Sequence, residues 1–343
     1  MFRRKTLFIL GAGASQEAGL PIGTKLAECI SELLEGNSLG GPPDPRHPGH
    51  QLLSLLYDKF SLPDNGYDRA AQLISRGVRF AKSIDDFLDG HSDKEPVQRV
   101  GKAAIVRSIL DAESQSLFRR YPFDSRDMSN ELDKTWYMKF FRILASDIKA
   151  QNVREIFDNI AFIIFNYDRC LEYFLENALQ LRYNISREEA QSIIDNLNII
   201  HPYGLVADLP RRAHGIPFGA TGTVDYVGLS DNVKTYTEQQ TAGDVLNAIA
   251  EAMFKAEQIA FLGFGYHEQN LDLLTPPKEL RTKPVYGTAK DWSDNDRDEI
   301  QGRLERMFQT PPPKLIPKSA VVIDTKVTCA QLFDNYGQSL TGR

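Results

Sequence analysis

Short apolar runs that end in a polar or glycine-rich turn recur along the chain, and this order constrains the fold more than any other feature. The runs are residues 6–10, 159–165, 198–200, 258–262 and 284–287, with one more near the end at 320–323. Segments of helical periodicity separate most of them. Strands that alternate with helices form a mostly parallel sheet with helices on both faces. The sequence therefore predicts an α/β fold of the Rossmann-like, doubly wound kind.

The helical segments divide the chain unevenly. The spacing expected of helices that flank such a sheet is found over residues 18–34, 169–181, 187–197, 242–256, 271–274 and 294–308. Residues 36–50 are rich in glycine and proline and predict a loop, where a dinucleotide-binding fold would have its second strand. The region that follows is mainly helical. We therefore expect a discontinuous domain over 1–35 and 153–310, a helical insertion over 36–152 and a tail over 311–343.

Composition excludes several classes of protein. Of the 343 residues, 42% are hydrophobic and 25% charged, which is enough to bury a sizeable core. The net charge of -6 argues against a general nucleic-acid or membrane-surface binder, which needs a basic face. No apolar run approaches the roughly 18 residues of a membrane-spanning helix. Cys29, Cys170 and Cys329 are widely spaced. Neither a zinc site nor a disulfide framework is therefore expected, and a cytoplasmic protein fits best.

A glycine-rich turn, Gly11-Ala12-Gly13-Ala14-Ser15, follows the first apolar run and precedes a helix. Glycines at such a place let a pyrophosphate approach the backbone, and a helix N-terminus favours negative charge. Ser15 can donate its hydroxyl to a ligand or cap the helix. The usual dinucleotide fingerprint has a third glycine where this chain has Gln16. A nicotinamide-dependent dehydrogenase is therefore disfavoured, and a glycine turn without a ligand is the alternative.

Polar side chains also follow the second and third runs. Asn166 and Asp168 leave the second run, where they can hold a ribose hydroxyl, a water molecule or a carboxamide. The alternative is a cap, in which Asp168 serves the first turn of a helix. His201 follows the third run and suits general base catalysis, with a packed or surface histidine as the alternative.

The fourth run ends in Gly263-Phe264-Gly265, whose glycines permit a close ligand or simply form a tight turn. All of these motifs stand at the carboxyl ends of expected strands. Those ends meet at one edge of a parallel sheet, which is where ligands bind in such folds. We therefore expect the motifs to lie close together.

In their order along the chain, these motifs resemble the sirtuin family. The order is a Gly-Ala-Gly-x-Ser turn followed by Gly-Leu-Pro, a strand-end Asn-x-Asp, a strand-end His with a nearby Gly, and a strand-end Gly-x-Gly. In particular the chain looks like the sirtuin-like domains of bacterial anti-phage defence proteins, over about residues 5–35 and 155–290. The segment Ser83-Ile84-Asp85-Asp86-Phe87-Leu88 is similar to one often found in those proteins.

The resemblance implies roles for the motif residues, because NAD in that family lies across the sheet with its pyrophosphate on the glycine turn. By this likeness the phosphates contact Gly11, Ala12, Gly13 and Ser15, and the adenosine end lies near Gly263, Phe264 and Gly265. Asn166 positions a water or ribose hydroxyl near the glycosidic carbon, and Asp168 helps to hold the nicotinamide amide. His201 takes a proton from a ribose hydroxyl or from water.

Departures from the family's protein deacylases argue against an acyl-lysine substrate. Deacylases follow Gly-Ile-Pro with Asp-Phe-Arg, whereas Gly19-Leu20-Pro21 is followed here by Ile22-Gly23-Thr24. The four zinc-binding cysteines that deacylases usually carry in two pairs are also missing. The histidine motif is His-Pro-Tyr-Gly rather than His-Gly, so the position of His201 is less firmly fixed than that of Asn166.

The expected activity is hydrolysis of NAD, as a substrate, to ADP-ribose and nicotinamide without a metal ion. The resemblance implies a role in anti-phage defence through NAD depletion. It also implies a homo-oligomer or a partner defence protein held by the insertion or the tail, with no direct contact to nucleic acid or membrane. The alternatives are a module that binds NAD or an ADP-ribose-like nucleotide without turnover, and a protein deacylase or ADP-ribosyltransferase.

Overall fold

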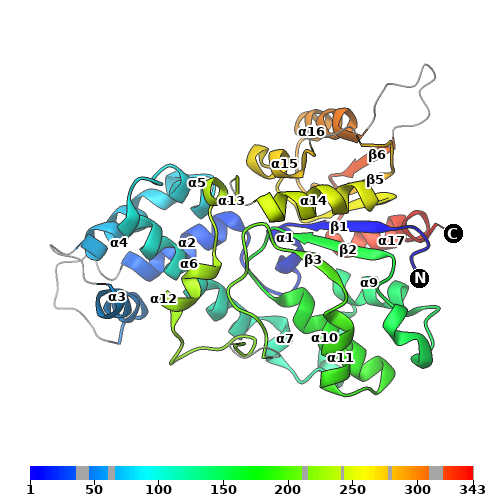
Figure 1. Ribbon diagram of the computed structural model, residues 1–343, viewed down its shortest axis with the longest axis horizontal. Helices are drawn as coiled ribbons and strands as arrows, with labels where there is room; N and C mark the ends of the chain where they lie inside the picture. Colours follow the sequence, from blue (N-terminus) through cyan, green and yellow to red (C-terminus); the bar gives the residue numbers. More distant parts are fainter. Residues whose placement is uncertain are drawn as a thin grey trace.

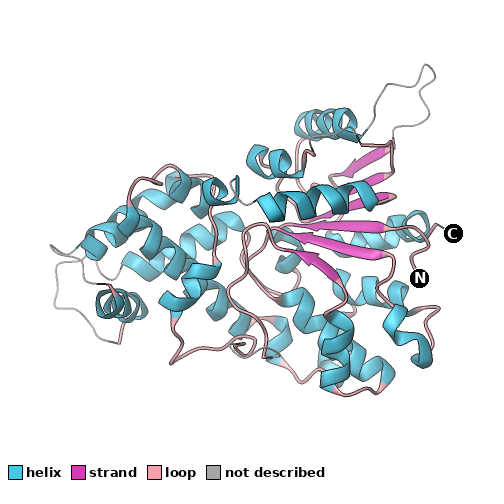
Figure 2. Ribbon diagram, viewed as in Figure 1, coloured by secondary structure: helices cyan, strands magenta, loops and turns pink. Residues whose placement is uncertain are grey.

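Six parallel strands form one sheet through the middle of the protein (Figure 2). The computed structural model describes residues 1–35, 46–60, 66–210, 215–240, 243–276, 280–308 and 320–342. The described strands are β1 (Thr6–Leu10), β2 (Ile160–Ile164), β3 (Asn198–Ile200), β4 (Gln258–Leu262), β5 (Val285–Thr288) and β6 (Val321–Asp324). They confirm the α/β fold with a parallel sheet.

The strand order, β3-β2-β1-β4-β5-β6, places the first strand in the centre. Thr6 pairs with Ile160 of β2 on one side and with Gln258 of β4 on the other. The chain builds outwards from β1 to β3, then returns to the other side of β1 and builds outwards to β6. The crevice at such a reversal, outside the carboxyl ends of the strands, is where open α/β sheets bind ligands. Here it lies between the ends of β1 and β4.

Alternate residues of the strands feed two separate apolar cores. Leu7 and Ile9 of β1 face one core, while Phe8 and Leu10 face the other, as the period of a strand requires. The first core takes in α14 (Gly243–Lys255), α15 (Glu268–Leu274) and α16 (Asp294–Phe308). The second takes in α9 (Trp136–Ala145), α10 (Cys170–Tyr183), α11 (Arg187–Ile194) and α17 (Cys329–Thr341).

A lobe of helices lies beside the carboxyl ends of the strands (Figure 1), and all of these helices except the first come from the expected insertion. Its helices are α2 (Gly23–Glu35), α3 (Pro48–Lys59), α4 (Gly66–Gly77), η1 (Val78–Phe80), α5 (Ile84–Asp89) and α6 (Glu95–Gln115). Against them lie α12 (Tyr226–Leu229), η3 (Ser230–Asn232) and α13 (Tyr236–Gln240). The core of the lobe is continuous with the first core of the sheet. The lobe is therefore packed onto the sheet edge where the motifs were expected.

The tail and the later part of the expected insertion both pack against the sheet, although the sequence predicted them to be separate from the sheet domain. β6 extends the sheet beside β5, and α17 packs against α9, so the described part of the tail belongs to the sheet. The later part of the insertion contributes to the second core. Its helices are α7 (Leu117–Arg120), α8 (Arg126–Leu132), α9 and η2 (Ala150–Glu155).

The helix expected over residues 18–34 begins later than the sequence indicated. A short helix α1 (Ala12–Gln16) starts inside the glycine turn, and the chain then breaks before α2 begins at Gly23. Gly19 has a φ of 93° and Pro21 follows it, and neither residue continues a helix. In the predicted loop over residues 36–50, residues 36–45 lie outside the described residues, and α3 begins at Pro48. Over the described ranges, no helix combines the length and apolar character that crossing a membrane requires.

Candidate functional site

A cavity of about 1000 Å³ lies at the carboxyl ends of the strands. The turns after β1, β2, β4 and β5 form one wall, and residues of α5 and α6 form another. This volume is at the upper end of the range of ordinary ligand sites. Eight of the ten residues expected to form the site line it: Gly11, Ala12, Gly13, Asn166, Asp168, Gly263, Phe264 and Gly265. The structure thus brings most of the motifs together at the predicted edge.

The two glycine turns pack directly against each other. The amide of Gly11 donates to the carbonyl of Leu262 at 3.1 Å, and the amide of Gly13 donates to that of Gly263 at 2.9 Å. A Cβ on Gly11 would lie 2.6 Å from the Gly263 carbonyl oxygen. The close approach of the two turns therefore requires glycine, whether or not a ligand is bound. It also occupies two of the amides expected to face a pyrophosphate.

Asn166 holds the end of β2 to the glycine turn. Its Nδ2 donates to the Gly11 carbonyl at 3.0 Å and to the Ser15 hydroxyl at 2.9 Å. The side chain is buried and lines the cavity. Its carbonyl oxygen Oδ1 accepts no hydrogen bond from the described part of the chain. The amide is therefore oriented by the protein while its oxygen remains available to a ligand or a water molecule.

Asp168 and Ser15 complete this polar network below the cavity. The carboxylate of Asp168 accepts a hydrogen bond from the Cys170 amide at 3.0 Å, at the start of α10, and interacts with the Ser15 hydroxyl. Burial raises the pKa of Asp168, and these two hydrogen bonds oppose the rise. Ser15 is buried and lies behind the cavity wall rather than in it. Asp168 thus supports the first turn of the helix, as the capping alternative expected, and also lines the cavity.

His201 does not line the cavity. Its Nε2 lies 2.9 Å from Oε1 of Glu172 on α10, and its Nδ1 is buried without a partner in the described structure. Among the described histidines, His267 lines the cavity, and it follows the Gly-x-Gly turn at the end of β4. Burial and the nearby charge of Lys82 lower the pKa of His267. The structure therefore separates His201 from the other expected site residues.

Several aromatic residues line the cavity, and among the described ones only Phe264 was assigned a role by the sequence motifs. Phe165 packs edge-on against Phe264, with ring centroids 5.1 Å apart. Tyr203, at the end of β3, donates from its hydroxyl to Oδ1 of Asn270 on α15 at 2.6 Å. Tyr167, the middle residue of Asn-Tyr-Asp, donates to Asp85 of α5. The segment that contains Asp85 was recognised only by resemblance, and no chemical signal placed it at this site.

A buried ion pair fixes the start of α10 next to the site. The guanidinium of Arg169 contacts both carboxylate oxygens of Glu113 on α6, with Nη2 2.5 Å from Oε2. Nη1 of Arg169 also donates to the Ile216 carbonyl at 2.7 Å, and the Gly219 amide donates to Glu113 at 3.0 Å. Both side chains are almost fully buried. The pair therefore joins α6, α10 and the loop after β3 behind Asn166 and Asp168.

The comparisons with known proteins leave the site to be interpreted from its geometry. No protein-family model matches the chain, and no curated protein matches it. The arrangement is a cavity at the reversal point of a parallel sheet, with an oriented amide, buried carboxyl groups and aromatic walls. It suits an extended polar ligand with at least one planar ring.

Proposed function

We propose that the protein binds NAD in this cavity and hydrolyses the bond between nicotinamide and ribose. The observation that carries the proposal is the position of Asn166. It lies at a strand end beside the reversal point, with its amide nitrogen fixed by two hydrogen bonds and its oxygen without a partner among the described residues. The resemblance of the motif order to the sirtuin family supports the same assignment.

The reaction needs no general acid to protonate the leaving group. The electrons of the broken glycosidic bond pass to the ring nitrogen, so a cationic pyridinium departs as neutral nicotinamide. The site has to hold the ribose, stabilise an oxocarbenium-like carbon and direct water to it. The Oδ1 atom of Asn166 can accept a hydrogen bond from that water or from a ribose hydroxyl. Its fixed Nδ2 prevents the amide from turning away.

The base role implied for His201 has less support than the role of Asn166. The ring lies outside the cavity wall and is bonded to Glu172. We therefore assign His201 to holding the end of β3 against α10. The proposal of NAD hydrolysis does not depend on it.

The proposal predicts that Asn166→Ala lowers NAD hydrolysis by at least about a hundredfold while the fold persists, because the variant can no longer position the attacking water. Purified protein is incubated with NAD, first at low and then at high protein concentration, and nicotinamide and ADP-ribose are measured by chromatography. Asn196→Ala is the control, because Asn196 is exposed and bonds only within its own turn. Equal turnover by the wild type and Asn166→Ala would remove Asn166 from the mechanism.

A binding module without turnover is the second candidate. It is favoured by the position of His201, because the base that the resemblance implies for hydrolysis lies outside the cavity lining and is bonded to Glu172. Calorimetric binding of NAD without product at either protein concentration would support it. An oligomer, a partner protein and a role in anti-phage defence by NAD depletion belong to the same proposal, and the concentration series is the first test of self-association.

A further inference from the structure

Asp85 brings a carboxyl group into the cavity from the helical lobe. It lies in the first turn of α5, whose N-cap Ser83 accepts a hydrogen bond from the Asp86 amide at 3.1 Å. Both Asp85 and Ile109 of α6 line the cavity that Asn166 lines from the sheet. The lobe therefore supplies a titratable group to the wall that faces the strand ends.

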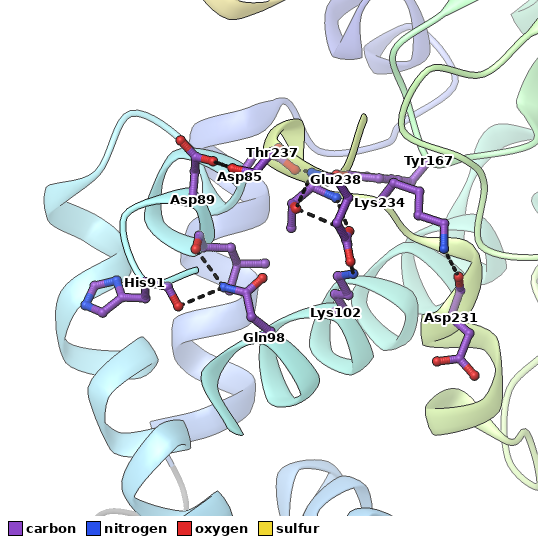
Figure 3. Close-up of polar contacts among 12 residues, drawn as sticks. Asp85, Asp89, His91, Gln98, Lys102, Tyr167, Asp231, Lys234, Thr237 and Glu238 are labelled. Atoms are coloured by element: carbon purple, nitrogen blue, oxygen red, sulfur yellow. Dashed lines mark hydrogen bonds and ion pairs between the residues drawn. The ribbon is translucent and has the colours of Figure 1, made fainter. Parts of the chain in front are cut away.

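Tyr167 orients this carboxyl group. Along the end of β2, Asn166 turns toward Ser15 while Tyr167 turns to the opposite side, into the core shared with the lobe. There its hydroxyl donates to Oδ1 of Asp85 (Figure 3). The second oxygen, Oδ2 of Asp85, accepts no hydrogen bond from another residue of the described chain. One oxygen is thus held by the protein, and the other is available to whatever occupies the cavity.

Contacts farther along the lobe hold α5 in this position (Figure 3). The hydroxyl of Thr237 on α13 donates to Asp89, one turn beyond Asp85. Lys102 of α6 contacts Glu238 of α13 at 2.7 Å. These contacts lie outside the cavity lining. A side chain held on a packed helix is suited to a reaction that needs exact placement.

Resting on the proposed function, we propose that Asp85 is a catalytic carboxylate for cleavage of the nicotinamide–ribose bond, facing the ribose from the helical lobe. As the C1′–N bond breaks and its electron pair moves to the nicotinamide nitrogen, positive charge develops on the ribose. The negative carboxylate stabilises that charge. Water then forms the new bond to C1′, and the proton that it loses passes to Oδ2 of Asp85 and from there to solvent.

The surroundings of Asp85 make its carboxylate a stronger proton acceptor than an ordinary aspartate, because they raise its pKa. Burial raises the pKa of Asp85, the hydrogen bond from Tyr167 lowers it, and the charge of Asp86 adds to the rise. A carboxyl group whose pKa is moved toward the working pH is a more effective base. Tyr203, beyond the end of β3, is a further titratable group within electrostatic range of Asp85. Glu238 on α13 acts on Tyr167 instead, and Lys102 is its ion-pair partner.

The test uses the full chain and the substitution Asp85→Asn. The new amide oxygen can still accept the hydrogen bond from Tyr167, so the fold should persist while the charge is lost. We expect kcat for nicotinamide release to fall at least tenfold, with NAD binding by calorimetry changed less than threefold. Asp93→Asn is the control, because Asp93 is exposed in the turn between α5 and α6 and lies outside the cavity lining, and its kcat should stay within twofold of the wild type.

A second variant distinguishes a catalytic role of Asp85 from a purely structural role in the cavity wall. Tyr167→Phe removes the donor that stabilises the ionised carboxyl group, so the acid limb of the kcat–pH profile should move to higher pH. An unchanged kcat in Asp85→Asn, or an unmoved acid limb in Tyr167→Phe, overturns the role of Asp85 and leaves NAD hydrolysis standing. Absence of nicotinamide release from the wild type rejects both proposals, so the two failures are distinguishable.

Discussion

Arg169→Met is expected to lower the free energy of unfolding by about 3–5 kcal/mol, because it leaves the Glu113 carboxylate buried without its cation. The wild-type pair is almost fully buried, and the guanidinium also satisfies the carbonyl of Ile216. Methionine fills similar space but can donate nothing to these acceptors. Urea denaturation followed by circular dichroism measures the loss as a lower midpoint with an unchanged slope.

Arg142→Met provides the matched control for this loss. Arg142 pairs with Asp133 at 2.6 Å, and both side chains are about half exposed. Exposed ion pairs contribute only about 0–1 kcal/mol, so this variant should unfold near the wild-type midpoint. If Arg169→Met is no more destabilising than Arg142→Met, the buried pair does not hold α6 to α10 in the way described.

The loss of stability caused by Arg169→Met should also depend on pH. Burial raises the pKa of Glu113, and the Arg169 guanidinium opposes that rise, so its removal moves the pKa farther above the ordinary value of 4.5. Between the ordinary and the raised value, the folded state then binds more protons than the unfolded state. The free energy of unfolding therefore falls as pH increases through this window. The variant should lose less stability at about pH 5 than at about pH 8.

Gly263→Ala is expected to lower the free energy of unfolding by about 3 kcal/mol or more. The added Cβ atom has two effects, a strained backbone conformation and a steric clash. Gly263 has a φ of 55°, and a Cβ there would lie 2.0 Å from the Ala14 amide nitrogen. Left-handed backbone alone costs an ordinary residue about 1–2 kcal/mol. The collision adds to this because it is with backbone rather than with a movable side chain. Since the β1 and β4 turns would be forced apart, the melting temperature and NAD binding should fall together.

Gly222→Ala separates the two effects. Gly222 has a φ of 89°, yet a Cβ there meets no atom within 4 Å. This variant should show only the conformational cost, on the order of 1 kcal/mol. Equal losses of stability in the two variants would mean that the close packing of the glycine turns adds nothing.

The sheet was predictable because its strands are short, apolar and bounded by clear turns. All six observed strands overlap the predicted runs, and α16 spans exactly the predicted 294–308. For the tail the sequence predicted a strand but not helix α17, although its N-cap Thr328 forms a capping box. The late start of α2 was not predicted, because the helical spacing of apolar residues begins before Gly19 and Pro21 and continues after them. The backbone conformation at Gly19 nevertheless keeps the helix from starting before Gly23.

The site was predictable where it depends on strand ends and was not predictable where it depends on packing. Asn166 and the glycine turns share one edge because parallel strands require it. His201 also ends a strand, but β3 is an edge strand and its histidine bonds to Glu172 on α10. Asp85 is distant in sequence and reaches the cavity only because the lobe packs onto the sheet. Tertiary contacts of this kind leave no periodic signal in a single sequence.

The central position of β1 has a consequence for biosynthesis. Thr6–Leu10 is completely buried between β2 and β4, and β4 begins only at Gln258. The ribosome therefore makes the middle strand first and its second neighbour roughly 250 residues later. At about 5–20 residues per second, this leaves an apolar strand without one of its neighbours for ~12–50 s. The strand must be shielded from water and from other chains through that interval. The helices between β1 and β2 are made next, and they are the first part of the chain that can cover it.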